Sequence, residues 1–272
     1  MKEVKIKGAT IPALGLGTFQ LEDNKAFEIT KAALAEGYRH IDTAQIYRNE
    51  EGVGKAIQAS DVAREDVFLT TKVWRESLAK KDFLPSVEQS LKKLKTDYVD
   101  LLLIHWPNTG VPVAEYMEEL MKAQQKGYTK YIGVSNHPTK LLDEVLATSA
   151  DIITNQVEYH PLINQDKLYT YLQQHNLTLT AYSPIAQGKV LGNPVLKSIA
   201  EKYGKNEVQV SLRWLMQQDS VMAIPRTSKT SHLKSNIDVF DFELTQEEVK
   251  QIDQLKKDNI RVVNPSFAPD WD

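Results

Sequence analysis

Short apolar runs alternate with longer amphipathic segments along almost the whole chain, and this alternation constrains the fold more than any other feature. Most of the runs are continuously apolar instead of alternating with polar residues. Continuous apolar runs are typical of strands in a parallel sheet whose two faces are covered by helices. The predicted strands comprise residues 13–17, 38–41, 67–71, 99–104, 131–134, 152–157, 177–181 and 221–224.

The segments between the predicted strands carry the signals of helices. Asp82 is expected to cap a helix that has Pro85 in its first turn, with apolar residues following at helical spacing. Thr245 and Glu248 have the spacing of a capping box at the start of a later helix. The apolar face of the first helix comprises Leu84, Val87, Leu91 and Leu94, and the other predicted helices comprise residues 24–35, 113–125, 140–147, 206–216 and 245–255.

Eight strands that each lead into a helix predict a (β/α)8 barrel, formed by residues 1–272 as a single domain. A doubly wound sheet is the structural competitor, but it would carry G-x-G-x-x-G after its first strand. Residues 15–20 are Gly-Leu-Gly-Thr-Phe-Gln, which lacks the third glycine. Residues 4–11 are expected to form a hairpin that closes the bottom of the barrel, and residues 264–272 to form an irregular arm.

Composition excludes several classes of function. The 33 basic and 36 acidic residues give a net charge of -3, so no basic excess exists for binding nucleic acid or a membrane surface. The absence of cysteine excludes disulfides, thiolate nucleophiles and iron–sulfur clusters. The six histidines lack the spacing of metal ligands, so we expect no metal. Because the sequence has neither a signal-peptide pattern nor an apolar run of about 18 residues, we expect a cytoplasmic protein. We also expect a monomer.

Polar residues follow nearly every predicted strand. In a barrel of this kind the reactive groups lie at the carboxyl ends of the strands, and these ends converge on one space. A single polar residue would mean little, because strands commonly end at a polar residue. The combination of several such residues favours an active site. The residues are Gly17, Thr18, Asp42, Lys72, His105, Ser135, Asn136, Gln156, Glu158, Tyr182, Ser183, Pro225 and Arg226.

Some of these side chains could act together. Lys72 lies among apolar residues, where a lysine is unusual unless it is paired or catalytic. Alone, Asp42 could cap a turn and His105 could be a satisfied core residue. Tyr47 follows Asp42 by five residues, so a phenol, a carboxylate, an ammonium and an imidazole are expected at the same end of the barrel.

Several long motifs occur in the order found in aldo-keto reductases. They are GYRHIDTAQIYRNE at residues 37–50, DYVDLLLIHWP at 97–107, IGVSN at 132–136 and YSP at 182–184. The chain resembles that family over residues 11–272. Its ending, PSFAPDWD at residues 265–272, is similar to that of the short bacterial 2,5-diketo-D-gluconate reductases.

The resemblance implies a nicotinamide-dependent oxidoreductase with a catalytic tetrad and no metal. It assigns the tetrad to Asp42, Tyr47, Lys72 and His105, and the substrate pocket to Phe19, Ile46, Trp74 and Trp106 beside Tyr47 and His105. It places the nicotinamide on Tyr182 and its carboxamide against Ser135, Asn136 and Gln156. The remaining implied cofactor contacts are Gly17, Thr18 and Asp42, then Ser183, Pro184, Ile185, Ala186 and Gly188 near the pyrophosphate and ribose, and Ile224, Pro225, Arg226, Thr227, Ser228, His232 and Asn236 at the adenosine end.

Two departures from the family pattern concern the cofactor. Arg226 stands where the family usually has a lysine, which keeps the charge and suits phosphate. His232 stands where the family often has an arginine that contacts the 2′-phosphate. NADPH is therefore the expected cofactor and NADH a possible one.

The chemistry of these groups predicts reduction of aldehydes and ketones, and the resemblance implies small dicarbonyls and keto-sugars among them. Tyr47 would donate the proton, with its pKa lowered by Lys72, and a neutral His105 would orient the carbonyl. Two alternatives are an aldolase that uses Lys72 as a Schiff base and a non-catalytic module that binds the cofactor. The short segment after Leu255 is expected to leave the pocket open and its specificity broad.

Overall fold

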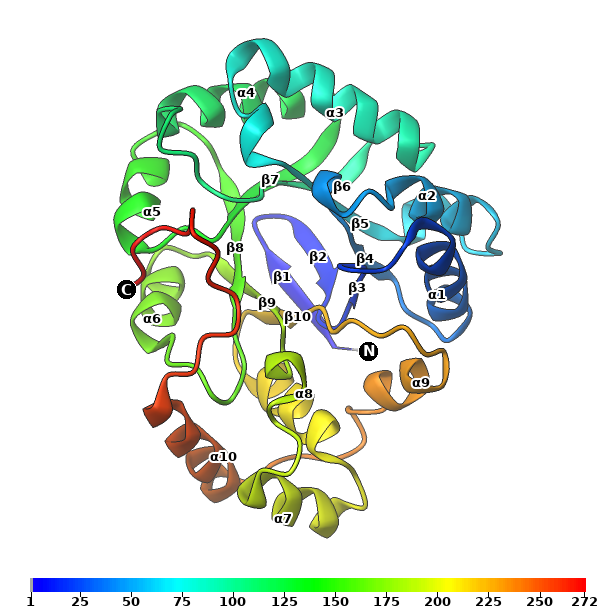
Figure 1. Ribbon diagram of the computed structural model, residues 1–272, viewed down its shortest axis with the longest axis vertical. Helices are drawn as coiled ribbons and strands as arrows, with labels where there is room; N and C mark the ends of the chain where they lie inside the picture. The colour runs from blue at the N-terminus through cyan, green and yellow to red at the C-terminus, as the bar shows by residue number, and fades with distance from the viewer. Residues whose placement is uncertain (1) are drawn as a thin grey trace.

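The computed structural model describes residues 2–272, and eight of its strands form one parallel sheet in which neighbours in the chain are neighbours in space. The sheet curls around a central axis with helices outside it (Figure 1). The strands are β3 (Leu16–Gly17), β4 (His40–Asp42), β5 (Phe68–Val73), β6 (Val99–Ile104), β7 (Thr129–Ser135), β8 (Ile152–Glu158), β9 (Thr178–Tyr182) and β10 (Val221–Ala223).

Backbone hydrogen bonds between the first and last strands close the sheet into a barrel. The amide of Gly15 donates to the carbonyl of Ala223 over 2.8 Å, and the amide of Gly17 donates to that of Pro225 over 3.0 Å. Glycine is needed at position 17, because a Cβ there would lie 2.7 Å from the carbonyl oxygen of Ile224. The (β/α)8 barrel predicted from the alternation is confirmed, and the doubly wound alternative is wrong.

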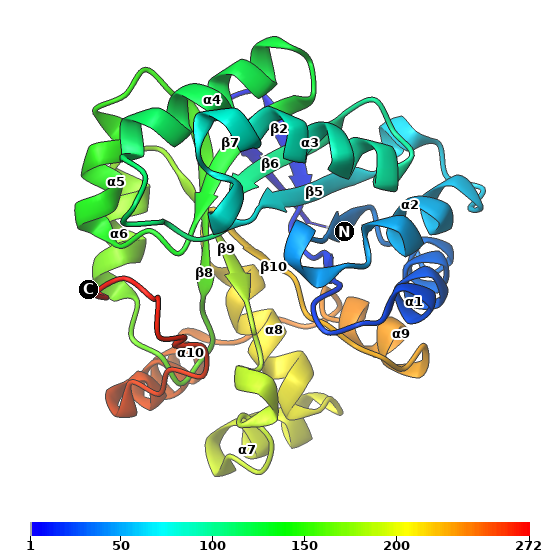
Figure 2. The ribbon, with the colours of Figure 1, turned by 45° about the horizontal axis from the view of Figure 1, so that its top comes forward.

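In the part of the chain that the structure describes, ten α-helices lie outside the barrel (Figures 1 and 2). Two of them begin at capping boxes, Asn206 with Gln209 and the predicted pair Thr245 with Glu248. The helices are α1 (Asp23–Ala35), α2 (Glu50–Gln58), α3 (Lys80–Leu94), α4 (Val113–Gln125), α5 (Thr139–Leu146), α6 (Asp166–Gln174), α7 (Pro194–Tyr203), α8 (Glu207–Gln217), α9 (Ser231–Ile237) and α10 (Gln246–Asp253).

The start of α3 differs from the sequence prediction. Ala79 is the N-cap, and its carbonyl accepts the amides of Asp82 and Phe83 over 2.9 and 3.0 Å. Asp82 therefore lies in the first turn, where its charge still suits the positive end of the helix dipole. Pro85 is tolerated because the bond it cannot donate would have gone to Lys81, an exposed residue.

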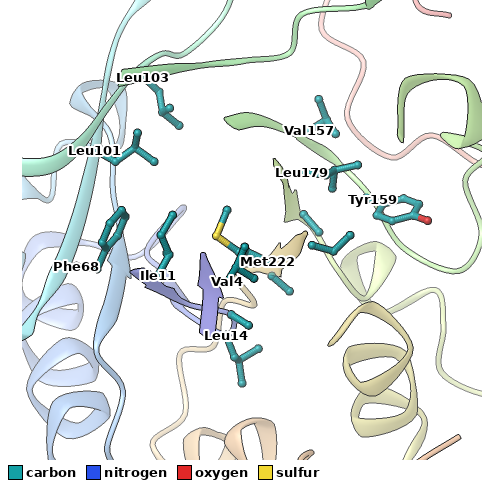
Figure 3. Close-up of a cluster of buried hydrophobic side chains, with 14 of the residues drawn as sticks. Val4, Ile11, Leu14, Phe68, Leu101, Leu103, Val157, Tyr159, Leu179 and Met222 are labelled. Carbon is teal, nitrogen blue, oxygen red and sulfur yellow. The ribbon is translucent and has the colours of Figure 1, made fainter. Parts of the chain in front are cut away.

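A hairpin closes the amino end of the barrel, as predicted. Strands β1 (Glu3–Ile6) and β2 (Ala9–Pro12) pair through a turn at Lys7 and Gly8, which both have positive φ. Val4 and Ile11 point from the hairpin into the barrel core (Figure 3). This end is packed with apolar side chains, so polar chemistry is left to the opposite end.

After α10 and a 3-10 helix (Gln254–Asp258), the chain folds back across the carboxyl end of the barrel without further helix or strand. Glu158 at the end of β8 accepts the amides of Val262 and Val263 over 2.6 and 2.8 Å. The Asp272 carboxylate accepts the amide of Thr139 at the start of α5 over 2.9 Å. The tail is thus fixed at two points beside α5 and α6 (Figure 1). Within residues 2–272, no helix combines the length and apolarity needed to span a membrane.

Candidate active site

A buried ion pair lies at the carboxyl end of β4 and β5. Lys72 Nζ is 2.5 Å from Asp42 Oδ1, and neither residue is more than 1% exposed. Lys72 also donates to the carbonyl of Thr43 over 2.9 Å, while Gln156 donates to Asp42 Oδ2 over 2.8 Å. Burial lowers the pKa of Lys72, and the Asp42 carboxylate opposes that shift. The Thr43 carbonyl and the Gln156 side chain therefore hold Lys72 and Asp42 in position.

Tyr47 places its hydroxyl 3.4 Å from Lys72 Nζ. It ends a 3-10 turn (Gln45–Tyr47) that is tied to β5 by a hydrogen bond of 2.8 Å from the amide of Trp74 to Gln45 Oε1. Burial raises the pKa of Tyr47 well above its ordinary value, and the charge of Asp42 adds to this.

A lowered pKa is expected from Lys72 alone, but the pKa of Tyr47 is raised, because burial of the phenol and the charge of Asp42 act in the opposite direction. A raised pKa is compatible with a proton donor. The Tyr47 hydroxyl keeps its proton at neutral pH until negative charge develops on a group beside it.

His105 completes this group at the end of β6. Its ring lies edge-on to Tyr47, with the centroids 5.5 Å apart, and edge-on to Trp74 at 5.3 Å. Burial, and then the charge of Lys72, lower the pKa of His105 well below its ordinary value. The imidazole is neutral at neutral pH. Its Nδ1 is buried and has no hydrogen-bond partner within residues 2–272.

Ser135 and Asn136 join the ends of β6, β8 and β9 into one network. Asn136 donates to the carbonyl of His105 over 2.9 Å and accepts the Tyr182 hydroxyl over 2.8 Å. Ser135 donates to the carbonyl of Gln156 over 2.7 Å. Asn136 has a φ of 62°, a left-handed conformation that asparagine tolerates better than most residues.

His137 holds this network through the carbonyl of Ser135, and it was not among the residues predicted for the site. Its Nδ1 donates to the carbonyl of Ser135 over 2.9 Å, because a carbonyl can only accept. Its Nε2 therefore accepts the Tyr116 hydroxyl over 3.0 Å. Burial lowers the pKa of His137 to about 4, so the ring stays neutral. Its place directly after Ser135 and Asn136 was the one available signal.

The loop after β9 has an unusual backbone. Ser183, Ala186, Gln187 and Gly188 all have positive φ, between 46° and 93°. Loops that mix right- and left-handed residues turn successive amides toward one side and make concave sites for anions. The loop, which also contains Pro184 and Ile185, therefore fits the pyrophosphate contact that the resemblance implies.

The segment after β10 is more exposed. Arg226 donates to the carbonyls of Phe19 and Gln20 over 3.1 and 3.3 Å, and its guanidinium is accessible. Thr227 is buried, with its hydroxyl 3.4 Å from Nδ1 of the exposed His232. The cation and hydroxyl groups suit a phosphate. The predicted neighbours Ile224, Pro225, Ser228 and Asn236 lie along the same stretch.

The predicted residues at the end of the first barrel strand contact both the catalytic residues and the segment after β10. Thr18 donates from its hydroxyl to the carbonyl of Asp42 over 3.0 Å, and Gly17 lies at the seam with β10. Phe19 is 49% exposed, and its ring centroid is 5.0 Å from that of Tyr47. Ile46 is also exposed.

The tail places aromatic side chains against Trp74 and Trp106, two of the residues predicted for the substrate pocket. The Phe267 ring centroid lies 5.8 Å from that of Trp74 and 5.4 Å from that of Trp106. Trp271 packs on Trp106 at 6.0 Å. Trp106 is consequently only 5% exposed. The tail is short, but Glu158 and Asp272 anchor it, so its aromatic residues reach the pocket.

The described residues contain no group of three or more side chains that could hold a metal ion. What they do bring together is a phenol, a paired ammonium and a neutral imidazole, beside an aromatic wall. Such a set can deliver a proton to an oxygen and hydrogen-bond it, which is what the reduction of a carbonyl requires from a protein.

Comparisons with known proteins agree with this chemistry. Residues 13–257 match the model of the aldo/keto reductase family. The chain is 43% identical to methylglyoxal reductase DkgB of Yersinia pestis, over 97% of this chain and 100% of that protein. It is 45% identical to glyoxal reductase of Bacillus subtilis, over 95% and 94%. A crystal structure assigned as a 2,5-diketo-D-gluconic acid reductase B superposes with a TM-score of 0.97 at 45% identity, covering 100% of this chain and 98% of that one.

Proposed function

The chain belongs to the aldo/keto reductase family, and on that premise we propose that it reduces small dicarbonyl compounds and keto-sugars with NADPH. It is an oxidoreductase of carbonyl groups that uses a nicotinamide cofactor. The relatives named for methylglyoxal, glyoxal and diketogluconic acid support the substrate class. The observation that carries the proposal is the placement of the Tyr47 hydroxyl beside the buried pair of Lys72 and Asp42.

When bound, the cofactor supplies a hydride to the carbonyl carbon. Tyr47 Oη then gives its proton to the oxygen on which negative charge develops. Lys72 Nζ, 3.4 Å from that hydroxyl, stabilises the phenolate left behind, and Asp42 holds the ammonium in place. His105 is neutral and hydrogen-bonds the carbonyl oxygen, which fixes the substrate relative to Tyr47.

The protein's own groups also fit the cofactor. Asn136, Ser135 and Gln156 would hold the carboxamide, and the ring of Tyr182 would support the nicotinamide. The loop from Ser183 to Gly188 would hold the pyrophosphate. Arg226, Thr227, Ser228 and His232 would meet the adenosine end, where Arg226 favours the 2′-phosphate of NADPH over NADH.

Two observations disfavour the other candidate functions. Lys72 is fully buried and bonded to both Asp42 and Thr43, which opposes its use as a Schiff-base nucleophile. The complete tetrad opposes a non-catalytic role. We also propose that residues 1–272 act as a single domain and a monomer in the cytoplasm, because one chain supplies the whole tetrad and that compartment supplies reduced cofactor.

The Tyr47→Phe variant tests the proposal. It should lose about 10²- to 10⁴-fold in turnover of methylglyoxal, because only the proton donor is removed, and keep its affinity for NADPH. The Tyr131→Phe variant is the matched control, since its hydroxyl bonds Gly8 at the opposite end of the barrel. Retention of more than about a tenth of the activity by Tyr47→Phe would refute the role of Tyr47.

A further inference from the structure

The segment that carries Tyr47 is fixed at both of its ends. Thr43, before the turn, donates from its hydroxyl to the side-chain oxygen of Asn49, after the turn, over 2.8 Å. Asn49 in its turn donates to the carbonyls of Thr18 and Leu21 over 2.8 and 2.9 Å. These bonds fix where the segment leaves and rejoins the barrel, but none of them involves a residue of the turn itself.

The contact between Tyr47 and Lys72 is too long to position the phenol by itself. The 3.4 Å between the hydroxyl and Nζ exceeds the usual length of a hydrogen bond. Ile46 and Arg48, on either side of Tyr47, are exposed. Phe19, whose ring packs on that of Tyr47, is 49% exposed. The place of the phenol therefore depends on the conformation of the turn.

The side chain of Gln45 joins this turn to two other elements. Its Oε1 accepts the amide of Trp74, directly after β5, over 2.8 Å. Its Nε2 donates to the hydroxyl oxygens of Ser86 and Ser90 on α3 over 3.1 and 3.2 Å. Both hydroxyls donate within α3, Ser86 to the carbonyl of Phe83 and Ser90 to that of Ser86, so their oxygens are left to accept. The amide of Trp74 can only donate, so the carboxamide has one orientation.

Gln45 is close enough to Tyr47 in the chain to control its position. The amide of Tyr47 donates to the carbonyl of Ala44 over 3.1 Å, which makes Gln45 and Tyr47 parts of one turn. The amide that Gln45 accepts belongs to Trp74, whose ring lies edge-on to His105 at 5.3 Å. One carboxamide thus connects the proton donor with the imidazole that orients the carbonyl.

We propose that Gln45 is a positioning residue that sets the place of the Tyr47 hydroxyl for proton transfer. The inference rests on the proposed function. A misplacement of a reacting group by about 1 Å can cost about 10² in rate, even when the substitution lies away from the reacting atoms. Loss of the bonds of Gln45 should therefore slow the chemical step. It should leave the binding of substrate and NADPH nearly unchanged, because Gln45 is not among the residues expected to contact either.

The Gln45→Leu variant tests the inference, because it keeps most of the side-chain volume and removes all three hydrogen bonds. The chemical step is followed in a single turnover, as the loss of NADPH absorbance with saturating methylglyoxal. Its rate should fall about 10- to 10²-fold, while the half-saturating concentration of methylglyoxal and the affinity for NADPH change by less than about threefold. The ratio of the rates in light and heavy water should rise, because proton transfer becomes slower relative to the other steps.

A second variant removes the partners of Gln45 and leaves the turn untouched. Ser86→Ala combined with Ser90→Ala deletes the acceptors on α3 and keeps the bond to Trp74, so it should slow the chemical step by a smaller factor. Added to Gln45→Leu, the two serine substitutions should slow that step no further. If Gln45→Leu does not fold, the serine variant decides, and an unchanged rate in it would overturn the inference.

Gln217→Ala is the matched control. Gln217 is also half-buried, and its carboxamide donates to the carbonyl of Leu244 and accepts the amide of Leu244 over 3.0 and 2.7 Å. It ends α8, just before β10 begins at the amino end of the barrel. The variant loses a comparable set of hydrogen bonds far along the chain from Tyr47 and should leave the chemical step unchanged.

Three further results would overturn the inference. A chemical step in Gln45→Leu within about twofold of the unchanged protein would show that the turn holds its shape without Gln45. A similar loss in Gln217→Ala would mean that lower stability alone slows the reaction. Equal losses in the chemical step and in the affinity for NADPH would mean that the whole site is distorted. Absence of turnover by the unchanged protein with any carbonyl compound would instead refute the proposed function.

Discussion

Two regions of the barrel's carboxyl end differ in how their side chains are held. In the catalytic cluster (Asp42, Tyr47, Lys72 and His105), the ion pair is fully buried and bonded on every side. In the adenosine segment (residues 224–236), Arg226 and His232 are exposed, and His232 makes one long contact to Thr227.

The difference shows what the fold arranges in advance. The catalytic cluster has its geometry before any ligand arrives, because Lys72 contacts both Asp42 and Tyr47, and Tyr47 packs against His105. The adenosine segment presents the exposed side chains of Arg226 and His232, which can gain partners from a ligand. Substitutions in the cluster should therefore reduce activity and stability together, whereas those in the adenosine segment should change one affinity and little else.

The largest effect is expected from Lys72→Met. It removes the cation beside Tyr47 and leaves Asp42 buried with only Gln156 as a side-chain donor. Breaking a buried pair costs about 3–5 kcal/mol of stability, and we expect turnover to fall at least as far as in Tyr47→Phe. Denaturant unfolding and steady-state kinetics measure the two effects.

The double variant Lys72→Met, Asp42→Leu separates these effects. It removes the unpaired charge, so it should recover most of the lost free energy of unfolding but none of the activity. If Lys72→Met were as stable as the unchanged protein, the ion pair would not contribute to the stability of the fold. The proposed difference between the catalytic cluster and the adenosine segment would then be refuted.

A smaller effect is expected in how the free energy of unfolding depends on pH. Burial lowers the pKa of His137 to about 4, against an ordinary value of 6.5. A histidine with a lowered folded-state pKa adds stability that is complete above pH 6.5 and is lost as the pH falls toward 4. Between pH 7 and 5 this residue alone should reduce the free energy of unfolding by about 2 kcal/mol.

His137→Gln should be less stable at pH 7 but should lose less stability on acidification. Urea unfolding at several pH values measures the slope. Tyr116→Phe is the control, because it removes the hydroxyl that His137 accepts and leaves the imidazole in place. It should keep most of the pH dependence. An equal slope in His137→Gln and the unchanged protein would show that other groups govern acid sensitivity.

The smallest effect is expected from His232→Arg, which should increase the preference of the adenosine segment for NADPH over NADH. An arginine there can give the 2′-phosphate a charge-assisted contact, so NADPH should bind about tenfold more tightly and NADH unchanged. Fluorescence titration with both cofactors measures this. Ser231→Arg adds the same charge one residue earlier and is the control. Equal gains for NADPH and NADH would show that His232 does not face the 2′-phosphate.

Sequence reasoning worked best where one local pattern decides a structure. The apolar runs predicted all eight barrel strands, and the spacing of Thr245 and Glu248 predicted a capping box that forms. The start of α3 was missed because the helix begins at Ala79, whose side chain makes no capping hydrogen bond and so gives no sequence signal. The roles of the individual site residues stay predictions, although the structure brings Asp42, Tyr47, Lys72 and His105 together.

Contacts between segments far apart in the chain could not be predicted from the sequence. His137 reaches Tyr116 across 21 positions, and Glu158 binds amides more than 100 positions away. Neither partner leaves a periodic signal, so Phe267 could not be placed beside Trp74 and Trp106 in advance.

The sequence by itself determined the barrel, its closed amino end and the set of polar groups at the carboxyl end, because these follow from side-chain periodicity and from the direction of parallel strands. Only the tertiary structure decided the charge states and the pocket. Burial, which is a property of the packed molecule, keeps Tyr47 protonated and His105 neutral. The tail becomes a wall of the pocket because Glu158 and Asp272 bind it, and such bonds exist only after the barrel has brought their partners together.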